Sequence, residues 1–233
     1  MVLYSKSVNH LSEFLKYIAD KSSKGEDRIP PLATLSKELQ VSVASLREQL
    51  EVARVLGFVE VKPKTGIKWL PYTFMPSLLL SVTYAITISS DYFEQFRDFR
   101  NHLEAAYFIE SATKLSKNDI DQLILIVDSA ETKINTIPPQ LPHQEHRDFH
   151  ARIFSRVKNS FVQSVFLVYW DVYEFKGYSI INDLDYLNRV WHYHRKVLVG
   201  IQTGNIIQSY EAFLEHKELM VKNIKNVPSQ TFE

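Results

Sequence analysis

The beginning of the chain alternates short apolar stripes at helical spacing with polar segments. The first stripe predicts a helix from residue 8 to about residue 19. Its members are Val8, Leu11, Leu15 and Ile18. A shorter stripe predicts a second helix over about residues 34–39. A third helix is expected to begin after Ser42, whose hydroxyl can accept from a free backbone N–H, and to end near Val55, before Gly57.

A short two-stranded hairpin is predicted after these helices. Apolar and polar residues alternate from residue 59 to 62, residues 62–66 form a turn, and residues 67–70 return as a second strand. Helix, helix, turn, helix and hairpin is the order of a winged helix-turn-helix, whose second paired helix enters the DNA major groove. The hairpin would be the wing, and Lys62, Lys64 and Lys68 give it the charge that phosphate contact requires. A small helical cap with a solvated basic turn fits the same pattern.

The rest of the chain has few Pro and Gly residues, which leaves room for long helices. Residues 73–89 are expected to form a linker with a short apolar helix at about residues 77–86. The helices expected after it span about residues 90–115, 116–134, 143–158, 160–175, 183–203 and 206–225. Ser90 and Ser116 are expected to cap the first two of these helices. The predicted fold is therefore mainly α. It combines an N-terminal winged helix-turn-helix with a small β-hairpin wing over residues 1–72 and a C-terminal all-helical bundle of about six helices over residues 90–233.

Charge and composition narrow the class of protein. The chain has 27 basic and 27 acidic residues, but residues 1–70 carry 11 of the basic and 8 of the acidic ones. A basic head on an acidic body fits a DNA-binding domain joined to a sensor domain. Cysteine is absent, which excludes disulfides and thiolate sites. The start lacks a signal-peptide pattern, and the apolar run Leu78–Ile88 is too short to span a bilayer, so we expect a cytoplasmic protein without a membrane partner.

Residues 29–70 resemble the DNA-binding head of the GntR family of bacterial regulators, with matching order and spacing. The matching positions are Pro30, Leu35, Glu38, Leu39, Val41, Ser42, Arg47, Glu48, Leu50, Gly57, Val59, Glu60, Pro63 and Gly66. The resemblance implies a homodimer that binds a palindromic operator in double-stranded DNA and regulates transcription in response to a small molecule. The candidate DNA-binding residues are Ser42, Ser45, Arg47, Lys62, Lys64, Thr65 and Gly66.

The head departs from the family pattern at two basic positions. Val43 and Glu51 each stand where the family usually has Arg. A second interpretation is therefore a regulator-like binding module that has lost specific DNA recognition and acts through protein partners. Arg47 is retained, although it could instead be a surface arginine paired with Glu51 one turn later.

The C-terminal part resembles the FadR-type subfamily of these regulators, whose helical FCD sensor domain often holds a metal. Arg100 and Glu104 match the first sensor helix at i, i+4 spacing. The segment HRDFH, residues 146–150, matches an Asp-x-x-Phe-His motif, with His146 in place of Asp. The resemblance implies a metal site formed by His146, His150, His194 and His216, next to a site for an organic acid.

The spacing of these histidines is itself suited to metal binding. His146 and His150 lie on one face of a helix, and His194 and His216 lie on two helices joined by a tight turn. Imidazole ligands favour zinc, nickel or copper over magnesium or calcium, and we expect zinc or nickel. The alternative is a set of buried histidines that are hydrogen-bonded to their neighbours. Asp148 is on the opposite helix face and does not replace the missing carboxylate.

Arg100 and the absence of catalytic motifs complete the functional hypothesis. A guanidinium can bind a carboxylate effector through two hydrogen bonds, so Arg100 is the candidate effector-binding residue. A structural salt bridge to Glu104 is an equally good interpretation. A metal-dependent hydrolase would be the enzymatic alternative. The sequence has no His-Glu-x-x-His motif, nucleophile elbow or phosphate loop, and we expect a protein that is not an enzyme.

Overall fold

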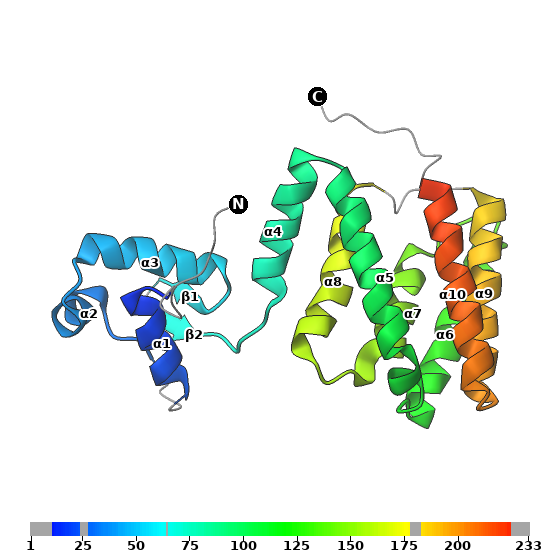
Figure 1. The fold of residues 1–233 in the computed structure, drawn as a ribbon, viewed down its shortest axis with the longest axis horizontal. Coiled ribbons are helices and arrows are strands. Elements are labelled where there is room, and N and C mark those ends of the chain that lie inside the picture. Colours follow the sequence, from blue (N-terminus) through cyan, green and yellow to red (C-terminus); the bar gives the residue numbers. More distant parts are fainter. Residues whose placement is uncertain (1–10, 24–27, 64, 178–182, 225–233) are drawn as a thin grey trace. The chain divides into compact units, whose positions relative to one another are not determined.

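The computed structural model describes residues 11–23, 28–63, 65–177 and 183–224 (Figure 1). The chain divides into two compact units, Met1–Leu80 and Ser81–Glu233, each with its own hydrophobic core. In its described part the protein is mainly helical, and its strands form one antiparallel sheet of two strands. The mainly α class with a small hairpin is therefore as predicted.

The first unit contains three helices followed by the hairpin. Its elements are α1 (Glu13–Ser23), α2 (Leu32–Leu39), α3 (Val43–Val55), β1 (Val59–Lys62) and β2 (Gly66–Trp69). Gln40 ends α2 in a left-handed backbone conformation with φ 55°. The Ser42 hydroxyl accepts a hydrogen bond from the Ser45 N–H at 3.2 Å, which is the predicted cap of α3. The buried core of this unit consists of Phe14, Ile18, Ile29, Leu35, Leu46, Ala53, Val59 and Ile67.

The hairpin follows α3 through a turn that requires glycine. Gly57 has φ +75°, a left-handed conformation that side chains disfavour, and a Cβ there would lie 2.6 Å from a Pro76 side-chain carbon. Beyond this turn, Val59 pairs with Trp69 in the antiparallel register. Ile29 adds a bridge to Ile67, so the segment before α2 is tied to β2.

The first helix begins later than the sequence predicted. α1 starts at Glu13, and Leu11 precedes it with 47% of its surface exposed, so Leu11 is not part of the buried stripe. The reason is local, because the Ser12 hydroxyl accepts a hydrogen bond from the Leu15 N–H at 3.3 Å and so satisfies one of the free N–H groups in the first turn of the helix. Val8 lies outside the described residues.

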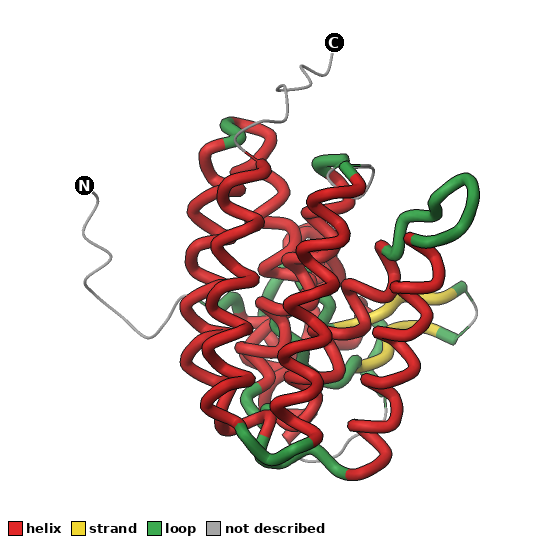
Figure 2. The backbone as a smooth tube through the Cα atoms, turned by 90° about the vertical axis from the view of Figure 1, so that its right-hand side faces the viewer, coloured by secondary structure: helices red, strands yellow, loops and turns green. Residues whose placement is uncertain are grey.

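The second unit is built from long helices that run alongside one another (Figure 2). They are α5 (Asp91–Ala112), α6 (Lys117–Ile134), α7 (His143–Ile153) with the 3₁₀ turn η1 (Phe154–Arg156), α8 (Ser160–Phe175), α9 (Leu184–Gln202) and α10 (Ile206–Ile224). Ser116 and Asp119 form the reciprocal capping box that starts α6, as the predicted Ser116 cap required. α8 begins and ends at the predicted residues.

Two details of this unit differ from the sequence-based predictions. Ser90 does not cap α5, because its backbone is already helical; the Ser89 hydroxyl accepts from the Asp91 N–H instead, at 3.2 Å. The helix predicted over residues 143–158 ends as an α-helix at Ile153 and tightens into η1. Its end is early because Val157 is extended and Asn159 caps the next helix.

The helix α4 (Met75–Ile88) contains the boundary between the two units. It corresponds to the apolar helix predicted in the linker and extends beyond the predicted range at both ends. It carries no charged residue. None of the described helices is long and apolar enough to cross a membrane.

Small residues bring α9 and α10 together as an antiparallel pair (Figure 1). A Cβ at Gly200 would lie 2.6 Å from the Ser209 Cβ and 2.8 Å from its backbone nitrogen, so glycine permits this close approach. The Ser209 hydroxyl donates to the Val197 carbonyl at 2.7 Å across the same contact. Between the helices, Gly204 turns the chain with φ +74° and Asn205 accepts from the Gln208 N–H at the start of α10.

Candidate metal centre

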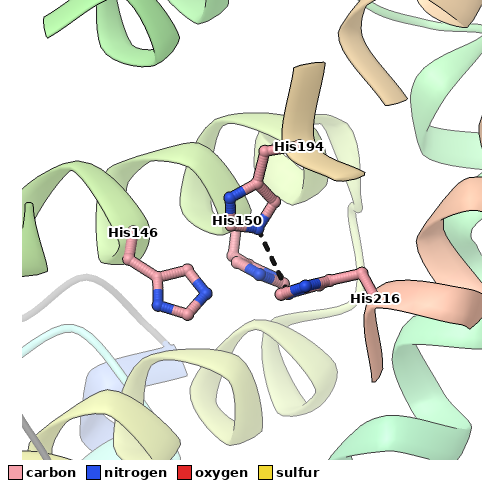
Figure 3. Close-up of side chains that lie close together, drawn as sticks. All are labelled: His146, His150, His194 and His216. Atoms are coloured by element: carbon pink, nitrogen blue, oxygen red, sulfur yellow. Dashed lines mark hydrogen bonds between the residues drawn. The ribbon is translucent and has the colours of Figure 1, made fainter. Parts of the chain in front are cut away.

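Four histidines from three helices converge in the second unit (Figure 3). His146 and His150 come from α7, His194 from α9 and His216 from α10. One nitrogen of each ring lies within 4.8 Å of the corresponding nitrogen of every other ring. The Nε2 atoms of His194 and His216 are 3.1 Å apart. We call this set the four-histidine cluster; the geometry brings together all the residues predicted as metal ligands.

Packing in the core holds the rings of the four-histidine cluster in place. On α7, Phe149 is fully buried, and its ring centroid lies 4.3 Å from that of His194. The indole of Trp170 lies 4.9 Å from the His146 ring, and that of Trp191 lies 4.6 Å from the His194 ring. These aromatic side chains pack around four rings that are almost completely buried.

Burial keeps the imidazoles of the four-histidine cluster neutral. The exposed fractions are 8% for His146, 2% for His150 and 0% for His194 and His216. Loss of solvation lowers the pKa of all four histidines well below the usual 6.5, and positive charge from neighbouring groups lowers it further. Metal binding needs neutral imidazole, so the site supplies its ligands in the required protonation state.

A buried ion pair on α5 orients one of the four rings. The Arg100 Nη2 atom lies 2.6 Å from the Glu104 Oε1 atom, and both side chains are almost completely buried. The same carboxylate oxygen lies 3.1 Å from the His150 Nδ1 atom. When the Nδ1–H of His150 donates to Glu104, its Nε2 lone pair is free for a metal, which is the usual arrangement around histidine ligands. Burial raises the pKa of Glu104, although Arg100 and Lys217 oppose that shift.

Several ring nitrogens are left without a partner in this arrangement. The Nε2 atoms of His146 and His150 are buried and form no hydrogen bond with the described residues. The Nδ1 atoms of His194 and His216 are in the same state. Buried polar atoms are nearly always satisfied in folded proteins, so these four buried rings, each with an unpaired nitrogen and each bringing one nitrogen within 4.8 Å of the others, could provide a donor set for a cation. The residues therefore fit a zinc- or nickel-type ion.

Arg100 has a structural role in addition to the one predicted for it. Its guanidinium carbon lies 4.3 Å from the centre of the Tyr169 ring, and its Nη2 atom lies 3.1 Å from the His150 Nδ1 atom. With Glu104 also bound, the salt bridge that the sequence offered as an alternative is present. The Nε atom of Arg100 is buried and has no hydrogen-bond partner among the described residues, so Glu104 does not use every donor of the guanidinium.

Other residues near the four-histidine cluster had no distinctive sequence signal. Lys217 follows His216 on α10, is 9% exposed, and donates to the Asn101 carbonyl on α5. A lysine in an amphipathic helix usually lies in solvent, so nothing in its pattern predicted burial. Three other histidines of the described residues, His102, His143 and His192, lie outside the cluster. Asp148 is not part of the cluster either, and its side chain accepts a hydrogen bond from Gln144.

The predicted DNA-contacting residues lie in the first unit. Arg47 is exposed on α3, and no ion pair among the described residues involves it. The alternative pairing of Arg47 with Glu51 is not formed, because the Glu51 carboxylate binds Arg54 through two hydrogen bonds. The Ser45 hydroxyl accepts from the Gln49 amide, so it also has a role inside the unit.

The wing residues are exposed in the hairpin. Lys62 is exposed and its ammonium lies 2.8 Å from the Glu60 carboxylate. Thr65 and Gly66 are exposed at the tip. Lys64, which the sequence also predicted as a phosphate contact, lies outside the described residues.

Comparison with known proteins agrees with this architecture. The FCD domain family matches residues 95–219. HTH-type transcriptional regulator LutR of Bacillus subtilis (strain 168) is 21% identical over 217 residues, which cover 90% of this chain and 95% of LutR. Streptococcus agalactiae GntR has a similar fold, with a TM-score of 0.60 at 15% identity over 89% of this chain and 99% of its own. E. coli McbR/YncC is similar with a TM-score of 0.50 at 14% identity, covering 92% and 98%.

The helical unit with its histidines thus has the fold and the sequence features of an FCD sensor domain. The chain belongs to the FCD-domain family and, with it, to the GntR family of transcriptional regulators, in the FadR-type subfamily. Its curated relative LutR is a transcriptional regulator rather than an enzyme. The family resemblance inferred from the sequence is confirmed.

Proposed function

We propose that this protein is a ligand-responsive regulator that binds a palindromic DNA operator as a homodimer. Residues 1–72 form the winged helix-turn-helix DNA-binding domain, residues 73–89 the linker and residues 90–233 the sensor domain. The observation that carries the proposal is the presence, in one chain, of an exposed basic helix-and-hairpin unit and a buried cluster of histidines suited to a metal. Such a regulator acts on DNA in the cytoplasm.

The DNA-binding part of the proposal rests on the exposed side of α3 and on the hairpin. α3 enters the major groove, where the guanidinium of Arg47 contacts a base edge or a phosphate. Ser42 and Ser45 lie at the N-terminal end of the same helix, next to the DNA backbone. Lys62, Lys64, Thr65 and Gly66 form the wing contact to phosphates. One such domain neutralises few phosphates, which favours a two-fold dimer on two half-sites.

The sensor part of the proposal places a zinc or nickel ion in the four-histidine cluster. The ion would join α7, α9 and α10, so its binding stabilises the folded sensor domain by mass action. An open coordination position can accept a carboxylate effector, and Arg100 is the candidate residue for its second contact. The proposed dimer has one state with high affinity for DNA and one with low affinity. The effector binds one of these states more tightly than the other, so it shifts their populations and changes the affinity for DNA.

DNA binding is tested by fluorescence anisotropy on the promoter fragment of the protein's own gene, over a series of salt concentrations. Arg47→Ala should weaken specific binding by about 1–3 kcal/mol if the side chain contacts a base. Arg54→Ala is the matched control, because Arg54 is exposed on the same helix and pairs with Glu51. Lys62→Ala should lower the salt slope by about one. Equal losses for Arg47→Ala and Arg54→Ala would contradict the docking geometry.

The same titration distinguishes a second candidate function, a module that has lost DNA recognition and acts through protein partners. It is favoured by Val43 at the first position of α3 and by the acidic, exposed Glu51 on that helix. This function predicts no salt-dependent DNA binding by the unmodified chain.

Metal binding is tested by elemental analysis and zinc calorimetry on protein purified without a histidine tag. His150→Ala should abolish binding, because the ring is one of the four that converge. His143→Ala is the control, since His143 lies on the same helix and its Nε2 atom lies 3.1 Å from Glu174 instead. Less than about one tenth of an equivalent of metal, with no heat on titration near neutral pH, would remove the metal from the proposal and leave an organic-ligand pocket.

A further inference from the structure

The first two turns of α3 present apolar side chains on the side of the helix that points away from the core. Val43 and Ala44 are the first two residues of the helix, and Val43 is half-buried while Ala44 is exposed. Leu46 is 0% exposed and marks the inner side of the helix. Arg47 and Glu48 follow Ala44 by three and four residues, so they share its outer side, and both are exposed. Methyl groups therefore lie next to one guanidinium and one carboxylate.

The uncharged polar side chains of the same turns already form hydrogen bonds inside the first unit. The Ser42 hydroxyl accepts from the Ser45 N–H at 3.2 Å. The Ser45 hydroxyl accepts from the Gln49 amide at 3.1 Å, and the Gln49 Oε1 atom accepts from the Phe14 N–H of α1 at 3.0 Å. These bonds fix the start of α3 against α1. Neither Ser45 nor Gln49 can turn toward a base without breaking one of them.

The charges of α3 cancel, which limits what the helix can gain from phosphates. Its charged residues are Arg47, Glu48, Glu51 and Arg54, and the last two are bound to each other. A helix without net charge gains little from the DNA backbone, so its contribution has to come from base edges. The apolar group on the base edges of the major groove is the 5-methyl group of thymine, which alanine-type side chains contact.

We propose that Val43 and Ala44 contact the methyl group of a thymine, so that each operator half-site contains a T·A pair at the start of α3. The inference rests on the proposed DNA-binding function and deepens it, because it names the base that the helix selects. A recognition helix contacts base edges with its N-terminal residues, which is where these two residues lie. Cytosine has a hydrogen atom in place of the methyl group, so a C·G pair at that position loses the contact.

The test uses a DNA duplex that the full chain selects from a random-sequence library, so that no operator has to be assumed. Fluorescence anisotropy then measures the affinity for this duplex and for the same duplex with uracil in place of every thymine. Uracil forms the same base pair and lacks only the methyl group. One buried methyl group changes an affinity by about fourfold, so the loss of one contact in each of two half-sites should weaken binding by about 16-fold.

Two variants assign the effect to the start of α3. Ala44→Gly and Val43→Ala each remove methyl groups there, and each should reduce the ratio of thymine to uracil affinity to about fourfold or less. Val52→Ala is the matched control, because Val52 is 49% exposed farther along the same helix, and it should keep the ratio of the unmodified chain. Uracil also changes the shape of the DNA, but this change acts on every variant alike. Circular dichroism compares the folding of each variant with that of the unmodified chain.

The outcomes separate this inference from the proposed DNA-binding function. A selected duplex that loses less than about twofold in affinity on uracil substitution would refute the thymine contact and leave the DNA-binding function intact. A large loss that is the same in Ala44→Gly, Val43→Ala and the unmodified chain would show that other residues contact the methyl group, and would refute the assignment. A library in which the chain enriches no sequence would show that specific DNA binding is absent, and the inference would be wrong with it.

Discussion

The buried histidines make the stability of the metal-free protein depend on pH in a predictable direction. In the folded state, burial holds the pKa of His146, His150, His194 and His216 well below 6.5, whereas in the unfolded chain each returns to about 6.5. Below that pH the unfolded chain therefore binds more protons than the folded one. The stabilisation is complete above about pH 6.5 and is lost as the pH falls.

The size of the effect follows from the number of rings. A pH of 5.5 is about one unit below the pKa of a histidine in the unfolded chain, and one pKa unit corresponds to about 1.36 kcal/mol. A histidine that stays neutral in the folded state therefore lowers the free energy of unfolding by about 1.4 kcal/mol at pH 5.5 relative to pH 8. Four of them lower the free energy of unfolding by about 5–6 kcal/mol. Glu104 acts in the opposite direction, because burial raises its pKa, and offsets part of that loss. A change of several kcal/mol is a large part of the stability of a typical domain.

The assay is urea unfolding of chelator-treated protein at pH 8.0, 6.5 and 5.5, followed by tryptophan fluorescence. A Trp69→Phe background removes the tryptophan of the first unit and leaves Trp170 and Trp191, whose indoles line the four-histidine cluster. His194→Leu should reduce the pH dependence by about a quarter, since one of the four titrating groups is removed. His102→Gln, at an exposed histidine outside the four-histidine cluster, is the control because it leaves the four buried rings in place. Stability that varies by less than about 1 kcal/mol between pH 8.0 and 5.5 would refute the argument that the rings are buried and neutral.

Two further substitutions test how the site is supported. Glu104→Gln leaves the Arg100 guanidinium buried without its counter-charge and should lower the free energy of unfolding by about 3–5 kcal/mol. The control is Glu110→Gln, in an exposed pair on the same helix, which should change that free energy by less than about 0.5 kcal/mol. Similar losses for the two variants in urea unfolding would contradict the role of the buried pair. Gly200→Ala places a Cβ against Ser209 and should destabilise the α9–α10 pair by about 1–3 kcal/mol despite the higher helix propensity of alanine. A melting temperature at or above that of the unmodified protein would show that the two helices are not in close contact.

Local signals along the chain were sufficient to predict most of the elements. Ser42 begins α3 and Ser116 begins α6 as predicted, because a cap depends on a side chain and a backbone N–H within a few residues. Where a local prediction was wrong, a neighbour competed for the same group. Ser89 rather than Ser90 provides the hydroxyl at the start of α5, and Ser12 shortens α1. Such alternatives differ by little energy, so the sequence alone does not separate them.

The sequence also determined which residues could form the site, but not that they would meet. His146 and His150 share a helix face because of their spacing alone. Their approach to His194 and His216 depends on where the fold places α7 relative to α9 and α10, and the last two helices approach each other closely at Gly200 and Ser209.

The tertiary structure alone decided the electrostatics around the ligands. The spacing of Arg100 and Glu104 allowed either an effector contact or a salt bridge, and only the fold shows the pair enclosed beneath Tyr169 and bound to His150. Lys217 likewise had the pattern of a surface lysine until α10 packed against α5. Whether a charge is solvated or buried depends on which helices cover it, and that depends on contacts between residues far apart in the chain.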